Sequence, residues 1–291
     1  MDRLNSGVIV GLVVVSALFH ALWNALLRLE PDKDRGLVGA IVVGTLLAAG
    51  ISIVRWAYGE VPFPTLASLA YTLLAGALEA VYFATLARAL DRGPLGAVYT
   101  ISRGGAVLVV WPASIALFAE HLTMTSATGS AVVLGGLVLS GLGAQRVKRP
   151  DDVGASGIPW AIACAASIAG YHLAYKAALQ GGGSGSAVFA LSLGLSAALS
   201  LVRLGRAGRA ALGGLVRTRA LRITLMGLVC GGSFLILMEA LARGGSGYVL
   251  TLRNTSVLFA AGLAYLIGEK PARAELAGAA LVAAGATLMS L

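Results

Sequence analysis

Long apolar stretches alternate with short polar connections along the whole chain. We read ten predominantly apolar runs, at residues 8–27, 37–55, 66–88, 95–118, 126–144, 158–179, 187–204, 222–242, 247–267 and 274–290. A helix of about 20 residues crosses the roughly 30 Å hydrocarbon core of a bilayer. The pattern predicts an all-α integral membrane protein with ten transmembrane helices and no room for an extramembrane domain.

Composition and charge agree with this prediction. Of the 291 residues, 58% are hydrophobic and 12% are charged, against about 45–50% and about 25% in soluble chains. These values exclude a soluble enzyme and a disordered protein. The net charge of +9 comes from basic residues in short connections, so we expect a lipid bilayer and no nucleic acid as partner. Cys164 and Cys230 lie inside apolar runs, where we interpret them as packing residues.

The two halves of the chain repeat one another. The segment "ALDRGPLGAVYTISR" from Ala89 matches "ALARGGSGYVLTLR" from Ala240, and His20 matches His172. Glycines 129 and 136 match glycines 278 and 285, and the offsets of all these matches lie between 148 and 152. Matches in order with a nearly constant offset indicate a duplicated unit.

We therefore predict two domains, residues 1–145 and 158–291, joined by a linker at residues 146–157. Each domain holds five predicted helices, and because five is odd the two must lie in opposite orientations across the bilayer. Inverted repeats of this kind are typical of alternating-access transporters.

The basic residues also predict an orientation. Sixteen Lys and Arg residues lie in the connections after odd-numbered runs, and three lie on the other side. Cytoplasmic loops carry the excess of positive charge. We expect both termini outside the cell and the Arg-rich connection at 205–221 in the cytoplasm.

Four motifs carry a family resemblance. "HALWNALL" in the first run, "RGPLGAVYTISRG" leading into the fourth, "FAEHLT" after it and "GEKP" after the ninth resemble the drug/metabolite transporter superfamily, in particular its ten-helix EamA type. The resemblance implies two inverted five-helix repeats around a midplane cavity lined by helices 1, 3, 4, 6, 8 and 9. Many members have cytoplasmic termini, whereas the loop charges here predict the opposite. The second half carries "RGGSG" in place of "RGPLG", so the half-sites need not be equivalent.

Glu79 is an ionisable residue in the middle of the third run, and helical spacing puts Tyr82 and Phe83 on its face. Ionisable groups at membrane depth are costly and face a bundle interior or a wet cavity. Glu79 could exchange a proton for substrate or contact a substrate amine. The alternative is a structural ion pair with an arginine of a neighbouring helix.

Arg103 and Arg253 occupy matching positions in the fourth and ninth runs, and Tyr99 lies one turn before Arg103. Each guanidinium group could face the cavity and bind a carboxylate or phosphate in bidentate fashion. The alternative is snorkelling to the interface.

His20 and Asn24 share a helix face, and His172 and Lys176 repeat that spacing in the second half. A histidine can change protonation near neutral pH, but an interhelical hydrogen bond is the simpler role. We expect Lys176 to snorkel and Trp23 to anchor the interface.

Other polar and small residues fit structural roles. We expect Glu239 to pair with Arg243 four residues later, and Glu120 and Glu269 to cap helices or pair in loops. The glycine pairs 129/136 and 278/285 are predicted to pack helices together, and a homodimer contact through them stays open.

These observations predict a secondary active transporter of a small zwitterionic or anionic metabolite, an exporter in the cytoplasmic membrane. The expected substrate-binding residues are Glu79, Arg103, Arg253, His20, Asn24, Tyr99, Tyr82 and His172. Without a phosphate-binding loop or a metal motif, we expect no enzyme, metal or cofactor, and coupling to protons through Glu79. The alternatives are an intramembrane enzyme for a lipid-linked substrate and a non-catalytic membrane subunit.

Overall fold

Helices make up all the regular structure that the computed structural model describes, which covers residues 3–92, 98, 100–145, 157–266 and 272–290. The first half contains α1 (Arg3–Arg28), α2 (Lys33–Ala57), α3 (Leu66–Arg92), the π-helical turn η1 (Thr100–Gly104), α5 (Gly105–Phe118) and α6 (Met124–Gln145). The second half contains α7 (Ile158–Gln180), α8 (Gly185–Arg243), α9 (Ser246–Arg253), α10 (Ser256–Leu266) and α11 (Arg273–Met289). The predicted linker falls almost entirely outside the described residues, so the domain division stays a prediction.

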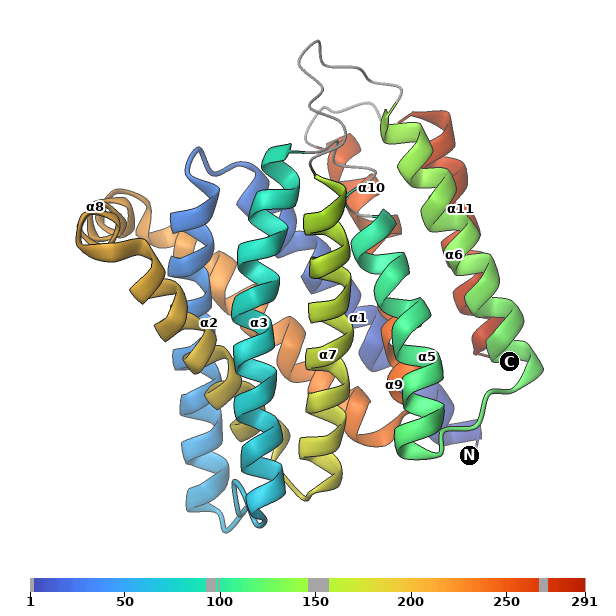
Figure 1. Ribbon diagram of the computed structural model, residues 1–291, viewed down its shortest axis with the longest axis horizontal. Coiled ribbons are helices and arrows are strands. Elements are labelled where there is room, and N and C mark those ends of the chain that lie inside the picture. The colour runs from blue at the N-terminus through green and yellow to red at the C-terminus, as the bar shows by residue number, and fades with distance from the viewer. Residues whose placement is uncertain (1–2, 93–97, 99, 146–156, 267–271, 291) are drawn as a thin grey trace.

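The long helices run side by side in one bundle, and the first turn of α1 and the last turn of α11 lie at the same end of it (Figure 1). Helices of one half pack mainly against helices of the other half. The main pairs are α2 with α8, α3 with α7, α1 with α8 and α6 with α11. The buried core therefore lies between the two halves.

The repeated glycines lie where α6 and α11 touch. A Cβ atom added to Gly136 would lie 2.6 Å from the carbonyl oxygen of Gly278. A Cβ atom added to Gly285 would lie 2.6 Å from the carbonyl oxygen of Gly129. The prediction that these glycines pack helices is confirmed, and the contact that they make lies within one chain. Small residues allow such close approach of helices in membranes.

Two of the predicted runs are interrupted helices. The fourth run has a π-helical turn at Thr100–Gly104 before α5, and the ninth is divided at residues 254 and 255 into α9 and α10. The predicted helix at 95–118 is thus helical from residue 100 to residue 118 with a π-helical first turn, and the predicted helix at 247–267 is divided into two by a short turn. Polar and glycine residues occupy both interruptions, where they favour local hydrogen bonds over the regular helical ladder.

The connection at 205–221 was expected to be a polar loop, and that expectation is also wrong. Helix α8 continues through it, with non-helical backbone angles at Gly205 and Arg219 alone. The continuous stretch therefore consists of three straight parts, at residues 185–204, 206–218 and 220–243. Alanine and leucine favour the helical middle part, and the burial of Leu212 against α2 adds to its stability despite the three glycines at 208, 213 and 214.

Six helical stretches of the described residues are long and apolar enough to cross a membrane. They are Ser6–Leu27, Lys33–Ala57, Leu66–Ala89, Ile101–Phe118, Met124–Leu142 and Gly185–Arg243. The remaining predicted crossings do not reach the required length or mean hydropathy. Helices α9, α10 and α11 have 8, 11 and 17 residues, and aromatic and polar residues lower the mean hydropathy of α7.

The glutamates predicted to have structural roles cap a helix or form an ion pair where the structure describes them. Glu120 accepts hydrogen bonds from the backbone N–H groups of Ser246 (2.6 Å) and Gly247 (3.4 Å) and so caps α9, which confirms the capping role. Glu269 lies outside the described residues. Glu239 and Arg243 form the predicted pair at 2.7 Å.

Two expectations of interfacial side chains are wrong. Lys176 is buried, and its Nζ donates to the carbonyl oxygens of Leu241 (2.9 Å) and Gly244 (2.7 Å) at the end of α8. Trp23 is buried rather than anchored at the interface. Lys176 has its partners at the end of α8, far along the chain, which helical spacing alone cannot reveal, whereas Trp23 donates to His20 three residues earlier in α1.

Candidate functional site

A small polar cavity lies inside the bundle, between helices of both halves. Residues of α1, α3, η1, α7 and α9 and the following Asn254 line it: His20, Asn24, Tyr82, Leu86, Ser102, Arg103, Ile168, Tyr171, His172, Leu250, Arg253 and Asn254. Its volume is about 30 Å3, which is room for a few water molecules and not for a metabolite. A metabolite could bind at this place only if the cavity were wider.

His20 lies at the centre of the polar contacts. Arg103 Nη2 contacts its Nε2 atom, and Arg253 Nη2 lies 3.2 Å from its Nδ1 atom. Trp23 Nε1 also lies 3.1 Å from Nδ1. Both nitrogens of one buried imidazole thus face side chains whose N–H groups can only donate.

Around His20 there are more hydrogen-bond donors than the imidazole ring can accept from. A neutral imidazole has one N–H donor and one acceptor nitrogen, while guanidinium and indole groups accept no hydrogen bond. His20 can therefore accept on only one of the two nitrogens that face Arg103 and Arg253. An anionic group beside Arg253 would give its buried guanidinium group an acceptor and would offset its charge in a low-dielectric interior.

The two arginines come from the interrupted helices. Arg103 lies within the π-helical turn η1, and Arg253 is the last residue of α9. Between α9 and α10 the backbone N–H groups of Asn254 and Thr255 donate to the carbonyl oxygens of Thr251 and Leu252, so a tight turn joins the two helices. The repeat places one such interruption in each half, and the packing of the halves brings both to His20. Neither arginine snorkels to the membrane interface, because both guanidinium groups contact His20 inside the bundle.

Arg253 and His172 have further unsatisfied groups. Arg253 is 3% exposed, its guanidinium group lies 4.2 Å from the ring centroid of Phe234, and its Nε atom has no hydrogen-bond partner among the described residues. Both ring nitrogens of the fully buried His172 also lack a partner there. Buried polar groups are almost always hydrogen-bonded, so these atoms indicate where a polar ligand or water would bind.

Glu79 lies apart from the cavity lining. Its carboxyl group is buried beside the hydroxyl groups of Tyr175 on α7 and Ser192 on α8, which are themselves 2.9 Å apart. One carboxyl oxygen, Oε2, has no hydrogen-bond partner among the described residues. No arginine of the described chain lies within 4.0 Å of the Glu79 carboxylate. The alternative role of Glu79, an ion pair with an arginine of a neighbouring helix, is therefore not observed.

A cluster of aromatic rings lies between Glu79 and the cavity. The ring of Tyr171 lies 5.7 Å from that of Tyr82, 5.1 Å from that of His172 and 5.6 Å from that of Tyr175, between centroids. Tyr175 reaches Glu79, while Tyr82, Tyr171 and His172 reach the cavity. The carboxyl group and the arginine pair are therefore separated by aromatic rings from α3 and α7.

The structure brings most of the predicted site residues to one place. His20, Asn24, Tyr82, Arg103, His172 and Arg253 line the cavity, Glu79 lies behind it, and Tyr99 lies outside the described residues. Asn24 donates through Nδ2 to the carbonyl oxygen of His20, 2.7 Å away. Sequence reasoning missed Tyr171, Tyr175, Ser192 and Asn254. Tyr171 adjoins His172 in the chain, but Ser192 gives no signal because only packing brings it to Glu79.

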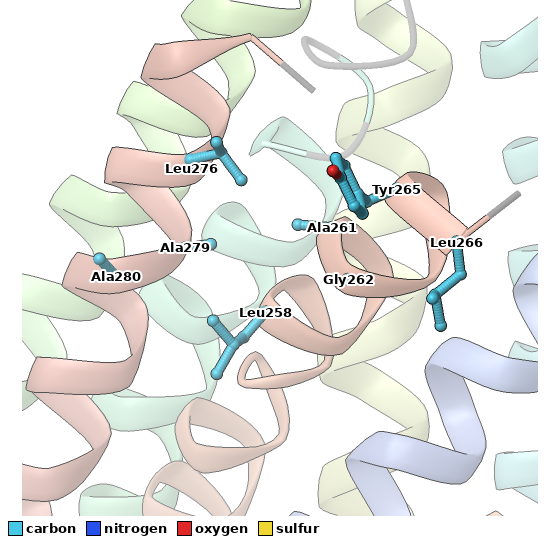
Figure 2. A pocket seen from close by; sticks show the side chains of 8 residues that line it. All are labelled: Leu258, Ala261, Gly262, Tyr265, Leu266, Leu276, Ala279 and Ala280. Carbon is cyan, nitrogen blue, oxygen red and sulfur yellow. The ribbon is translucent and has the colours of Figure 1, made fainter. Parts of the chain in front are cut away.

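A larger hollow lies elsewhere and is apolar. Figure 2 shows it between α10 and α11, lined by Leu258, Ala261, Gly262, Tyr265, Leu266, Leu276, Ala279 and Ala280. Its volume is about 460 Å3, and the Tyr265 hydroxyl is the only side-chain polar group in its lining. Because Tyr265 and Leu266 are largely exposed, acyl chains would cover this groove in a bilayer.

The fold and the buried polar site define a multi-pass helical membrane protein. The model of the EamA-like transporter family matches residues 155–291, the second of the two predicted units. This match confirms the resemblance to the drug/metabolite transporter superfamily. No curated protein sequence matches the chain significantly. A solved crystal structure superposes with a TM-score of 0.72 over 99% of this chain and 96% of that chain, at 19% identity, which shows a shared fold.

Proposed function

We propose that this protein is a secondary active transporter that exports a small metabolite carrying a carboxylate or phosphate group. Ten membrane crossings, arranged as two inverted five-helix repeats, move the metabolite by alternating access across the cytoplasmic membrane. Arg103 and Arg253 bind its anionic group, and Glu79 couples transport to protons or meets a substrate amine. No cofactor takes part.

Reciprocal helix contacts support the inverted repeat. Helix α1 packs on α10 and on α8, and its counterpart α7 packs on α5 and on α3. Close backbone approaches are reciprocal as well. A Cβ atom on Gly76 would lie 2.6 Å from the Ser192 carbonyl oxygen, and one on Gly227 would lie 2.7 Å from the Ala40 carbonyl oxygen. Gly76 and Gly227, like Ala40 and Ser192, are separated by the repeat offset, as a two-fold relation between the halves requires.

The helix lengths support ten crossings. Residues 185–204 and 220–243 of α8 are each long enough for one crossing at about 1.5 Å per residue. The pairs η1 with α5 and α9 with α10 each supply one interrupted crossing. Interrupted helices at corresponding positions of two halves are typical of transporter binding sites.

One observation carries the choice of an anionic substrate: the guanidinium groups of the buried Arg253 and the half-buried Arg103 face the two nitrogens of His20. A carboxylate or phosphate is the partner that guanidinium groups bind in bidentate fashion. A neutral or cationic substrate would bring no counter-charge to the buried guanidinium group of Arg253 in a low-dielectric interior, which is costly.

Glu79 has no counterpart in the second half of the chain, and a single carboxyl group suits the coupling of transport to protons. The repeat offset relates Glu79 to Cys230 and Tyr175 to Trp23, so the second half has no carboxyl group at the corresponding place. A single buried carboxyl group with one unpartnered oxygen can take up one proton, or one ammonium group of a zwitterion. Transport is then expected to depend on the pH difference across the membrane.

The proposal is tested by binding of acids and their neutral analogues. A ligand that binds the folded protein raises its unfolding temperature. Purified protein in detergent is screened against small carboxylates and phosphates and the corresponding amides or alcohols. We expect acids to stabilise the wild type, and the Arg253→Gln variant to bind them about tenfold to a hundredfold more weakly, as loss of a charged hydrogen bond implies.

The control is Arg243→Gln, which removes an exposed arginine at the end of α8 and leaves the cavity intact. Equal stabilisation by acids and amides, or unchanged binding in Arg253→Gln, would contradict the anionic substrate. The best acid is then loaded with a radiolabel into proteoliposomes. Release that follows an imposed pH difference supports a transporter, whereas chemical conversion of the acid without release indicates an enzyme.

A further inference from the structure

The middle part of α8, residues 206–218, runs across the direction of the other helices. Figure 1 shows it almost end-on at the upper left, while the parts before and after it run along the bundle. The bend before it is made by Gly205, with φ 66° and ψ −173°, and the bend after it by Arg219, with φ −130° and ψ 29°. The backbone at Gly205 is one that essentially only glycine adopts. The crosswise position is thus built into the chain.

The 206–218 segment has two different faces. Gly208 and Leu212 are buried and Leu215 is half-buried. A Cβ atom on Gly39 of α2 would lie 3.5 Å from Leu212 Cδ1, so this face rests on the first turns of α2. Arg206, Arg209 and Arg217 are exposed. At 3.6 residues per turn they lie within one arc, away from the buried face.

The arginines at the bends are already paired with carboxylates. Arg219 and Arg222 each lie 3.4 Å from the carboxylate of the buried Glu30, and Arg203 pairs with Asp34. These ion pairs hold both ends of the 206–218 segment to the connection between α1 and α2 and to the first turn of α2.

The three arginines of the segment itself have no carboxylate within 4.0 Å in the described part of the chain. Arg209 donates to the carbonyl oxygen of Leu201 at 3.1 Å. The described acidic groups in and beside the connection between α1 and α2, which are Glu30, Asp32 and Asp34, already have basic partners. The exposed face of the segment therefore carries uncompensated positive charge.

The flanking residues show where this charge lies relative to lipid. Val202 is 72% exposed and Leu221 is 75% exposed, one just before and one just after the segment. Exposed aliphatic side chains of a membrane protein face the hydrocarbon region, and here they border the exposed arginines, so the segment lies where lipid-facing and charged surfaces meet. A basic helix lying at such a boundary is typical of interfacial helices that contact headgroups.

We propose that the 206–218 segment is an interfacial helix that binds the phosphate groups of anionic phospholipids through Arg206, Arg209 and Arg217. The lipid is the occupant because the exposed arginines lie at the boundary of the hydrocarbon region, where phospholipid headgroups are the abundant anions. The segment contacts α2 and lies apart from the cavity, so this site is separate from the proposed transport site and does not depend on it.

The proposal is tested by counting lipids bound to the intact protein. Protein in an uncharged detergent is titrated with phosphatidylglycerol or phosphatidylcholine, and bound lipid is measured by native mass spectrometry. An arginine near an anionic surface contributes about 1 kcal/mol, which is about fivefold in affinity. We expect each of Arg206→Gln, Arg209→Gln and Arg217→Gln to weaken phosphatidylglycerol binding about fivefold, and the triple variant more.

The triple lysine variant is the control, because it keeps the charge and is expected to keep most of the binding. Thermal unfolding of each variant shows that it is folded, and the single substitutions still test the proposal if the triple variant is not. Equal binding of the two lipids overturns the proposal, and so does wild-type binding in the glutamine variants. Inorganic phosphate that displaces the lipid at equal concentration would show a general anion site and would also overturn it.

Discussion

Glu79 and Lys176 are two buried ionisable residues whose surroundings differ. Lys176 donates to two carbonyl oxygens at the end of α8, so its charge is stabilised where helix carbonyl groups lack partners. Glu79 has hydroxyl groups beside it but keeps one oxygen without a partner in the described chain. A satisfied buried group serves the fold, whereas an unsatisfied one is a candidate for function.

Replacing Glu79 by glutamine tests this distinction. The Glu79→Gln variant is expected to fold, because an amide can also hydrogen-bond with the hydroxyl groups of Tyr175 and Ser192. Its transport in proteoliposomes should no longer respond to an imposed pH difference, because the amide cannot exchange a proton. Glu239→Gln, which changes a half-exposed carboxylate at a helix end, is the control. A pH response that survives in Glu79→Gln would remove Glu79 from coupling.

Replacing Lys176 by methionine tests the structural role. The Lys176→Met variant leaves the carbonyl oxygens of Leu241 and Gly244 without their donor, and hydrogen bonds to charged groups contribute about 1.5–3 kcal/mol each. We expect a clearly lower unfolding temperature in detergent. Lys33→Met, at the exposed start of α2, is expected to change it little. Equal unfolding temperatures of the two variants would show that Lys176 does not hold the end of α8.

Among the helices, the contact between α6 and α11 shows how the two halves are joined. Neighbouring glycines on α6 have opposite surroundings: a Cβ atom on Gly136 would meet the backbone of α11, and one on Gly135 would meet nothing within 4 Å. A side chain at position 136 would collide with α11, so glycine is required there. At position 135 there is space for a side chain. The repeated glycines thus determine the distance between the last helices of the two halves.

This difference gives a prediction with a neighbouring control. Gly136→Ala should lower the unfolding temperature, because overpacking a close contact costs about 1–3 kcal/mol. Gly135→Ala should leave it unchanged or raise it, since alanine is favoured over glycine in a helix by about 1 kcal/mol. Thermal unfolding of both variants in the same detergent is the measurement. The reverse order would mean that α6 and α11 do not approach as closely as described.

The molecule as a whole has one strongly basic end. The described Arg203, Arg206, Arg209, Arg217, Arg219 and Arg222 lie at the end of the bundle where α2 begins, and Tyr58 lies just beyond the other end of α2. The excess of basic residues at one end predicts that this end is cytoplasmic. Both termini would then lie outside, opposite to many members of the EamA type.

Cysteine labelling tests this orientation. The native Cys164 and Cys230 are free and buried, so they should react little with a membrane-impermeant maleimide. We expect a Tyr58→Cys variant to be labelled in intact cells and a Thr218→Cys variant only after the membrane is permeabilised. The opposite result would place the basic end outside and would show that the loop charges do not determine the orientation here.

The sequence by itself determined the all-helical membrane fold and most of the helix positions, because hydrophobicity and length are local properties of the chain. It also singled out Arg103, Arg253 and His20, because buried ionisable residues at repeated positions stand out in an apolar background. Their functional role remains a proposal.

Only the tertiary structure decided how these residues meet. The partners of Lys176 and the packing of the 206–218 segment on α2 depend on segments far apart in the chain. The same holds for Ser192 beside Glu79 and for both arginines at one imidazole. Such contacts follow from how the two halves pack, and a pattern of local hydrophobicity carries no information about which distant polar groups will face each other.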